Sequence, residues 1–300
     1  MKDNSDSIKN YTQMKTILVP TNFSNYSTDA LVTAASIIRA KGGRIVLMHN
    51  VETLLTNWAQ LSESERMKHP DLRNQTDKVF REIQEIKSGI LLSGISVDSL
   101  ITYGVTSDEI VAASIQTNAD LVVMGLGERE PARDFVGSTV QKVVRETPCP
   151  VLSIRKEISN EKWTKVLVPV SLDFDIAVPF EKIAKISMEF GSVVQLLYVN
   201  TPNHFKRTAT AKKQMNEFKD KFPAIRIETA IYDHEEVEAG ILEFAESTKA
   251  DCIAMITFEH KHAPSYQLSV TDHILFHATV PVLAIYEGAQ ILQRKAMATV

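Results

Sequence analysis

"DLVVMGLGEREPARDFVGSTVQKVV", residues 120–144, joins an apolar run to an amphipathic stretch through a polar loop. The apolar run, which ends on Gly125, predicts a strand, and Gly137-Ser138-Thr139 predicts the start of a helix. The first N–H groups of a helix lack partners within it, and the helix dipole favours anions there. This stretch therefore indicates either a phosphate-binding loop or a turn and helix cap that bind nothing.

The same stretch belongs to an internal repeat, which is the first feature to establish before a fold is inferred. Four segments of the first half return in the same order in the second half: "KTILVPTNFS" from Lys15 and "TKVLVPVSLD" from Thr164, "RIVLMHNV" from Arg44 and "SVVQLLYV" from Ser192, "ADLVVMG" from Ala119 and "ADCIAMI" from Ala250, "TPCPVLSI" from Thr147 and "ATVPVLAI" from Ala278. The second copy is roughly 17 residues shorter between its second strand and its third helix. We predict one domain at 15–156, a second at 163–287 and a C-terminal tail at 288–300.

Short apolar runs alternate with amphipathic stretches in each copy, which predicts βαβ units. Ser24 is placed to cap a helix that ends at Gly42-Gly43, and Thr106–Glu109 has the pattern of a capping box. The strands expected in the first copy are Thr16–Pro20, Arg44–Val51, Ile95–Tyr103, Asp120–Met124 and Val151–Ile154. The predicted fold class is α/β, with two tandem, doubly wound, parallel five-stranded sheets and helices on both faces.

Three loops of the first copy should meet at one edge of its sheet, because ligands of such sheets bind beyond the carboxyl ends of the strands. They are "TNFS" after the first strand, "NVE" after the second and "GLGEREPARDFVGST" after the fourth. Two arginines of the third loop, Arg129 and Arg133, can pair with phosphate, whereas its acidic residues oppose an anion: Glu128, Glu130 and Asp134.

The segments "ILVPTNFSNYSTDAL", "VLMHNVE", "ADLVVMGLG" and "GSTVQKVVRETPCPVLSI" resemble the universal stress protein family, and the repeat resembles its tandem members. The resemblance covers Lys15 to about Tyr286 and implies a fold of the adenine-nucleotide alpha-hydrolase type. Many members bind ATP through a glycine, two residues, a second glycine, nine residues and Gly-Ser or Gly-Thr. It implies these nucleotide-binding candidates here: Asn22, Asn50, Gly125, Gly127, Gly137, Ser138 and Thr139.

The first copy departs from the family pattern at three positions. Gly125 and Gly127 are separated by Leu126 alone, so the first spacing is one residue short. The family's Asp falls on Asn22, which keeps hydrogen-bonding groups but not the charge. Asn50 stands where an apolar residue is usual.

The second copy departs further from the pattern. Positions equivalent to the three glycines hold Ile256, Phe258 and Leu268, and Ser171 replaces Asn22, while Ser269 matches Ser138. Side chains at the glycine positions oppose close approach of phosphate to the backbone. We predict no nucleotide site of the family type in this half.

Histidines give two weaker candidates. His49 follows the second strand, where either a satisfied histidine or a catalytic one is conceivable, but no catalytic partner is evident. His273 and His277 share a helix face at metal-compatible spacing, and His260 and His262 can complete a site; the alternative is a polar loop and an exposed helix. The basic stretch from His204 to Phe222 is interpreted as a solvated helix face.

Composition narrows the function classes. The net charge of −4 gives no basic field for nucleic acid, and no apolar run is long enough to span a membrane. The N-terminus lacks the apolar core of a signal peptide, and Cys149 and Cys252 fit buried thiols, so a cytoplasmic location is expected.

The resulting hypothesis is a non-enzymatic stress or regulatory protein that binds ATP or another adenine nucleotide in its N-terminal half, with Mg²⁺ bound only together with nucleotide. The alternative is an adaptor that binds no nucleotide and acts through protein contacts; a hydrolase or transferase on the same scaffold is a third. We expect the copies to pair within the chain through Pro150–Ile154 and Pro281–Ile285. Homodimerisation of the whole chain is left open.

Overall fold

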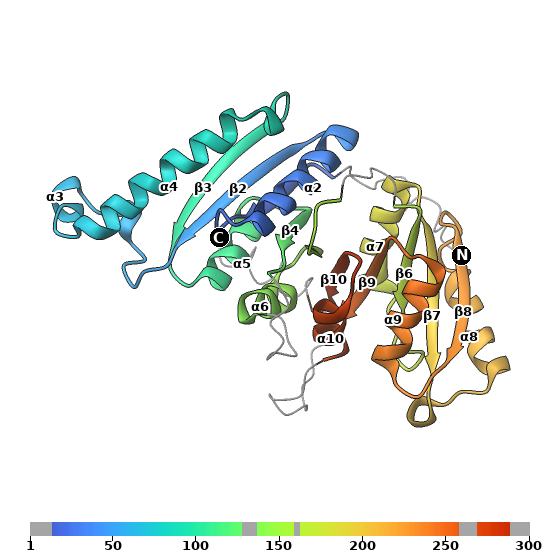
Figure 1. The fold of residues 1–300 in the computed structure, drawn as a ribbon. Coiled ribbons are helices and arrows are strands. Elements are labelled where there is room, and N and C mark those ends of the chain that lie inside the picture. Colours follow the sequence, from blue (N-terminus) through green and yellow to red (C-terminus); the bar gives the residue numbers. More distant parts are fainter. Residues whose placement is uncertain (1–13, 128–136, 159–162, 258–268, 289–300) are drawn as a thin grey trace, which may run out of the picture. The chain divides into compact units, whose positions relative to one another are not determined.

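The computed structural model of the chain describes residues 14–127, 137–158, 163–257 and 269–288. Within these ranges the chain forms two compact units, one from 14–127 and 137–158 and the other from 163–257 and 269–287 (Figure 1). The predicted domain boundaries at 15–156 and 163–287, and the tail at 288–300, stay predictions.

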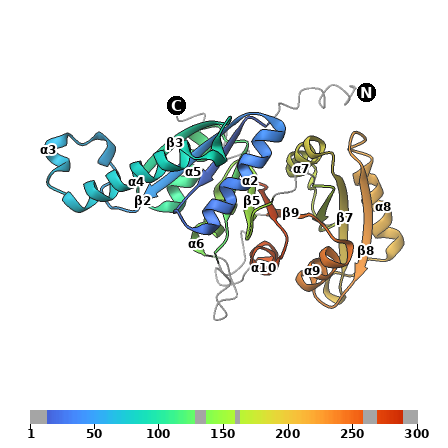
Figure 2. The same ribbon diagram turned by 45° about the horizontal axis from the view of Figure 1, so that its top comes forward.

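The first unit is a five-stranded parallel sheet in the order β3-β2-β1-β4-β5. Its strands are β1 (Thr16–Pro20), β2 (Arg44–Val51), β3 (Ser96–Tyr103), β4 (Leu121–Gly125) and β5 (Val151–Ile154). Its helices are α2 (Asn25–Lys41), α3 (Glu63–Arg66), α4 (Pro70–Ser88), α5 (Thr106–Gln116) and α6 (Ser138–Glu146), with 3-10 turns at Trp58–Gln60 and Ile90–Leu92. Right-handed crossovers place α2 and α4 on one face of the sheet and α5 and α6 on the other (Figures 1 and 2).

The second unit repeats this plan with the order β10-β9-β6-β7-β8. Its strands are β6 (Lys165–Pro169), β7 (Val193–Asn200), β8 (Ile227–Asp233), β9 (Cys252–Thr257) and β10 (Val282–Tyr286). Its helices are α7 (Ala177–Phe190), α8 (Thr208–Lys219), α9 (Val237–Thr248) and α10 (Val270–His277), with a 3-10 turn at Pro202–His204. The predicted fold class is confirmed, since each half is a doubly wound α/β sheet.

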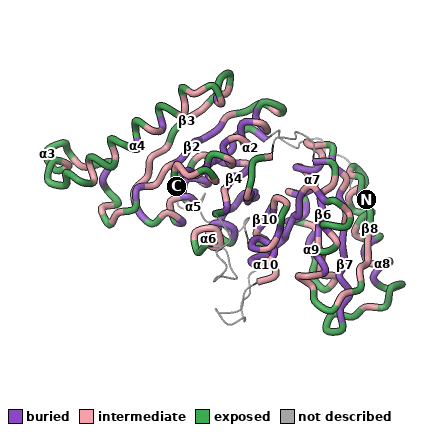
Figure 3. The backbone as a smooth tube through the Cα atoms, in the orientation of Figure 1, coloured by how far each residue is buried: buried purple, intermediate pink, exposed green. Residues whose placement is uncertain are grey.

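Burial follows the pattern expected of a sheet covered on both faces. Residues 17–19 of β1 and 45–48 of β2 are buried, and Figure 3 shows the burial of the central strands against the exposure of α3 and much of α4. Both cysteines are free and buried, as predicted, and burial raises the pKa of Cys252 to about 12. Among the described helices, none is long and apolar enough to cross a membrane.

The ends of α2 confirm the predicted caps, whereas the predicted capping box at Thr106 is wrong. Ser24 accepts a hydrogen bond from the Ser27 N–H at the start of α2, and Gly42 ends the helix. At α5 the N-cap is Val105, whose apolar side chain cannot accept a hydrogen bond, and Thr106 is the first helical residue. The Thr106 hydroxyl instead bonds to groups on the neighbouring β2 loop, as described below.

Candidate functional site

The carboxyl ends of β1, β2 and β4 open on a cavity of about 290 Å³ in the first unit. The start of α5 and the start of α6 complete its wall. Of the predicted nucleotide-binding residues, five line it: Asn22, Asn50, Gly125, Gly127 and Thr139. Gly137 and Ser138 are the N-cap and first residue of α6, directly before Thr139, and are not themselves part of the lining.

The loop after β1 is held by bonds between its own side chains. The Thr21 hydroxyl bonds to Ser27 at 3.0 Å and accepts from the Phe23 N–H at 3.0 Å. Asn22 Oδ1 accepts from the N–H and the hydroxyl of Ser24, at 3.2 and 2.6 Å. An aspartate at position 22 can accept the same two bonds, so the loop geometry fits the family's Asp as well as Asn22.

His49 is part of this loop's support. Its Nδ1 lies 2.8 Å from the Thr21 carbonyl oxygen and its ring stacks on Phe23, with centroids 4.5 Å apart. Phe23 has a φ of 62°, an unfavourable conformation for a bulky residue, which the stacking helps to stabilise. Burial lowers the pKa of His49, while the hydrogen bond to Thr21 opposes that shift. Because a carbonyl only accepts, Nδ1 carries the proton and Nε2 of the neutral ring is an acceptor.

Asn50 is fixed by three hydrogen bonds that come from β3 and the start of α5. Its Nδ2 donates to the Gly104 carbonyl and to the Thr106 hydroxyl, each at 3.0 Å, and its Oδ1 accepts from Thr102 at 3.0 Å. The Thr106 hydroxyl in turn donates to Glu52 at 3.1 Å. Asn50 therefore holds the wall of the cavity together, and most of its hydrogen-bonding capacity is already used.

The glycines of the predicted loop differ in whether the fold leaves room for a side chain. A Cβ on Gly125 would lie 2.1 Å from the Tyr26 carbonyl oxygen, so this glycine lets the start of α2 pack against the end of β4. A Cβ on Gly127 or Gly137 would meet nothing within 4 Å. Gly137 has a φ of −58°, which any residue adopts. The fold itself thus requires Gly125 but not Gly137.

The start of α6 supplies the groups suited to an anion. The helix begins at Ser138, as predicted, and its first N–H groups have no partner within the helix. The charged residues 128–134, including Arg129, Arg133, Glu128, Glu130 and Asp134, lie outside the described residues.

The histidine candidates for a metal site lie only partly within the described residues. The His273 and His277 rings lie tilted against each other with centroids 4.2 Å apart, while His260 and His262 lie outside the described residues. Among the described residues, no group of three or more His, Cys, Asp or Glu side chains is placed to hold a metal. The basic stretch forms α8, which buries only Ala211 and Met215 of its residues, in agreement with a solvated face.

Sequence reasoning missed several residues of the cavity wall: Tyr26, Ser27, Met48, Thr106, Ile110, Met124 and Val140. Met48 could have been predicted from the strand register, because it pairs with Pro20 at the same edge of the sheet. Thr106 was predicted to be a helix cap because its spacing from Glu109 matches a capping box. Its bond to Asn50, on another element, could not be inferred from that spacing.

Comparison with known proteins agrees with this geometry. The profile of the universal stress protein family matches residues 14–155. A universal stress protein of Thermus aquaticus is 32% identical over 143 residues, which are 47% of this chain and 98% of that protein. The chain belongs to the universal stress protein family. A second member, from Methanocaldococcus jannaschii, is 26% identical over 157 residues, 48% of this chain and 97% of its own length.

A solved universal stress protein structure shows that the two-copy fold occurs in this family. The protein, from Archaeoglobus fulgidus, superposes with a TM-score of 0.69 at 19% identity, over 91% of this chain and 98% of its own. A functionally unknown Pseudomonas aeruginosa protein superposes with a TM-score of 0.62 at 13% identity, over 95% and 98%. At these identities the likeness establishes the fold alone.

The described residues of the second unit differ from the first cavity at the candidate positions. Ile256 and Ser171 occupy the positions of Gly125 and Asn22, whereas Phe258 and Leu268 lie outside the described residues. At α10, Ser269 and Asp272 form a capping box, with the Ser269 hydroxyl donating to the buried Asp272 carboxylate at 2.8 Å. A carboxylate at this helix start takes the place that a phosphate would need.

Proposed function

We propose that the chain is a non-enzymatic stress-response protein that binds ATP or another adenine nucleotide in its first unit. The observation that supports this most is a cavity at the carboxyl edge of the sheet that reaches the N-terminus of α6. Its volume of about 290 Å³ lies near the lower end of ligand pockets. Base and ribose would occupy the cavity, and the phosphates would lie at the start of α6.

The described residues fit the nucleoside better than they fit a metal. Neutral His49 offers an acceptor at Nε2, and Asn22 keeps an amide group beside the cavity. No acidic group set for Mg²⁺ is present among the described residues, so we propose that Mg²⁺ binds only with the nucleotide phosphates. A cytoplasmic location and the absence of catalysis belong to the same proposal.

The position of Asn22 provides the direct test. We expect Asn22→Asp to tighten binding of an adenine nucleotide by about 1–2 kcal/mol, because hydrogen bonds to the ribose become charge-assisted. Thermal shift with ATP and Mg²⁺ measures this, since bound ligand raises stability by RT ln(1 + [L]/Kd). If millimolar ATP shifts neither the wild type nor Asn22→Asp, the nucleotide proposal is wrong.

An adaptor function is the second candidate, and one observation favours it. The segment between β2 and β3 exposes large apolar side chains: Leu54, Met67, Phe80 and Ile90, of which Leu54 and Ile90 are 99% and 94% exposed. These side chains lie at separate places, after β2, after α3, within α4 and after α4, where a partner protein can reach each of them. Self-association that falls in a Leu54→Ser/Ile90→Ser variant, measured by analytical ultracentrifugation, would support this candidate; equal association of both proteins would oppose it.

A further inference from the structure

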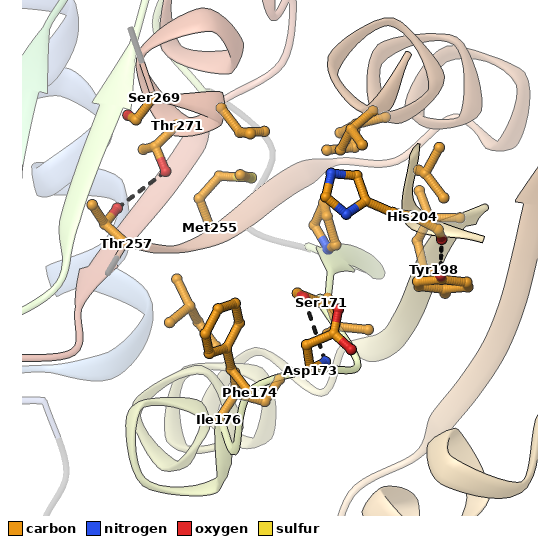
Figure 4. Close-up of a pocket in the computed structure, with 18 residues that line it drawn as sticks. Ser171, Asp173, Phe174, Ile176, Tyr198, His204, Met255, Thr257, Ser269 and Thr271 are labelled. Atoms are coloured by element: carbon orange, nitrogen blue, oxygen red, sulfur yellow. Dashed lines mark hydrogen bonds between the residues drawn. The ribbon is translucent and has the colours of Figure 1, made fainter. Parts of the chain in front are cut away.

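The second unit has a cavity of its own, of about 310 Å³, at the carboxyl edge of its sheet. The ends of β6, β7 and β9 and the starts of α9 and α10 form its wall. Figure 4 shows the side chains of Phe174, Met255 and His204 arranged around the same space. The cavity therefore lies in the place where the first unit has its candidate nucleotide site.

The strands pair in the same register in both units, so the residues that line the two cavities can be compared one by one. Pro20 of β1 pairs with Met48, as Pro169 of β6 pairs with Leu197. Ile17 pairs with Leu121 in the first unit, and the repeat places Val166, which pairs with Cys252, at the same point.

Six positions of the wall have changed toward apolar side chains, whereas Asn22, Ser24 and Val140 correspond to the polar residues Ser171, Asp173 and Thr271. In the first cavity the residues are Ser27, His49, Asn50, Thr106, Gly125 and Thr139. Their equivalents in the second cavity are Ile176, Tyr198, Val199, Val237, Ile256 and Val270. Five of these six replacements are aliphatic, and the sixth, Tyr198, is a buried aromatic ring. At these six positions the wall of the second cavity is more apolar than the wall of the first.

Ile256 also accounts for a difference in the neighbouring helix. Gly125 allows the backbone of Tyr26 to pass directly against β4, and α2 begins at Asn25. An isoleucine at this position requires the chain to lie further away. Accordingly α7 begins only at Ala177, although the residue equivalent to Asn25 is Phe174, and Phe174 lines the cavity instead.

The polar side chains of the second cavity are bonded to one another. Thr257 and Thr271 share a hydrogen bond of 3.2 Å, and the Tyr198 hydroxyl donates to the His204 carbonyl. At the mouth, Lys206 forms an ion pair with Asp173 at 2.7 Å. The His204 imidazole lines the same cavity and is exposed, so it can exchange a hydrogen bond with a ligand.

Charge in this wall disfavours an anionic ligand. The carboxylate of Asp272 is buried in the capping box at the start of α10, directly behind Ser269 and Thr271 of the lining. Lys206 is already paired with Asp173, a residue of the lining. A ligand that carries no charge avoids both the repulsion and the cost of desolvation.

We propose that this second cavity binds an uncharged, largely apolar small molecule, enclosed by Phe174, Met255 and Ile256 and accepting or donating one hydrogen bond at His204. This site is separate from the nucleotide site and does not depend on it. On this proposal the first copy has a polar binding site and the second an apolar one. The side chains that replace the glycines in the second half then form part of the apolar site.

A matched pair of substitutions tests the proposal in the full chain. Ser171 and Asn22 are equivalent, each at the mouth of its own cavity, so Ser171→Trp fills the second and Asn22→Trp fills the first. The probe is N-phenyl-1-naphthylamine, an uncharged dye that fluoresces in apolar surroundings. We expect saturable binding of one dye per wild-type chain, weakened at least about tenfold in Ser171→Trp and unchanged in Asn22→Trp.

Two results would overturn the proposal. One is the absence of saturable dye binding by the wild type. The other is equal dye affinity in Ser171→Trp and Asn22→Trp, which would place the dye elsewhere on the surface. If Ser171→Trp does not fold, as judged by circular dichroism, Val237→Phe narrows the cavity from α9 and must weaken the dye in the same way.

Discussion

Gly125 and Gly137 separate the demands of the fold from those of a ligand. A methyl group on Gly125 would overlap the Tyr26 carbonyl oxygen at 2.1 Å, whereas one on Gly137 would point into open space. The sequence pattern treats both glycines as parts of one motif. The structure gives them different roles, because only Gly125 has backbone packed against it.

We therefore predict that substitutions at these two glycines affect stability and nucleotide binding differently. Gly125→Ala should reduce the free energy of unfolding by about 1–3 kcal/mol, the usual cost of overpacking. Gly137→Val should reduce it by at most about 1 kcal/mol, the scale of a poorer N-cap, yet should abolish nucleotide binding by preventing close approach of phosphate. Urea unfolding and ATP titration of both variants measure these effects. Normal ATP affinity in Gly137→Val would show that phosphate does not reach α6.

His49 makes a second prediction at this scale, about pH. Its pKa is lowered in the folded protein by burial, so the unfolded chain binds the proton more readily. The resulting contribution to stability is present above the ordinary pKa of about 6.5 and is lost as the pH falls through the lowered value. We expect the unfolding free energy of His49→Gln to depend less on pH than that of the wild type between about pH 5 and 7. Identical pH slopes in urea unfolding would contradict it.

The positions of the site residues were predictable, but their bonds were not. Asn22, Asn50 and Gly127 were expected at one edge because parallel strands bring their carboxyl ends together. The three bonds of Asn50 come from Thr102, Gly104 and Thr106, on elements that only the sheet places beside it. Spacing along one chain cannot show which groups satisfy a side chain across the sheet.

Among the elements, the strands were the most predictable. Β-branched apolar runs give β1, β2 and β5 with the expected bounds, since strands covered on both faces must be apolar throughout. Strand β3 begins at Ser96 and β4 ends at Gly125, each one residue from expectation. The helix α5 starts where expected but without the predicted cap, because the Thr106 hydroxyl bonds to Asn50 and Glu52 instead.

In each unit an aspartate directly before β4 or β9 binds the backbone at the start of the neighbouring strand, β1 or β6. Asp120 Oδ2 accepts from the N–H groups of Lys15 and Thr16, at 2.8 and 3.0 Å. In the second unit, Asp251 Oδ2 accepts from the N–H groups of Thr164 and Lys165, at 2.8 and 2.9 Å. Both copies thus keep this aspartate and its two backbone hydrogen bonds, although their cavity walls differ.

We predict that Asp120→Ala and Asp251→Ala each reduce the free energy of unfolding by about 1–3 kcal/mol, the scale for hydrogen bonds to a charged group. Asp98→Ala is the control, because its ion pair with Arg44 is exposed and should contribute about 0–1 kcal/mol. Chemical unfolding of the three variants makes the comparison. Equal losses of unfolding free energy in all three variants would contradict a special role for Asp120 and Asp251.

At the scale of the whole molecule, the repeat supplies one scaffold twice and allows the two cavities to diverge. The first keeps Asn22, Asn50 and an open helix start, whereas the second has Ser171, Val199 and a helix start closed by Asp272. Pairing of the copies through Pro150–Ile154 and Pro281–Ile285 stays a prediction, as does homodimerisation.

The divergence predicts the stoichiometry of nucleotide binding. Isothermal titration of the full chain with ATP and Mg²⁺ should give one equivalent per chain, because Ile256 and the Asp272 carboxylate oppose phosphate in the second unit. Asn22→Trp, which fills the first cavity, should remove that equivalent. Ser171→Trp, which fills the second, should leave both the stoichiometry and the affinity unchanged. Two equivalents in the wild type, or one that survives Asn22→Trp, would show that the second unit holds the nucleotide despite its side chains.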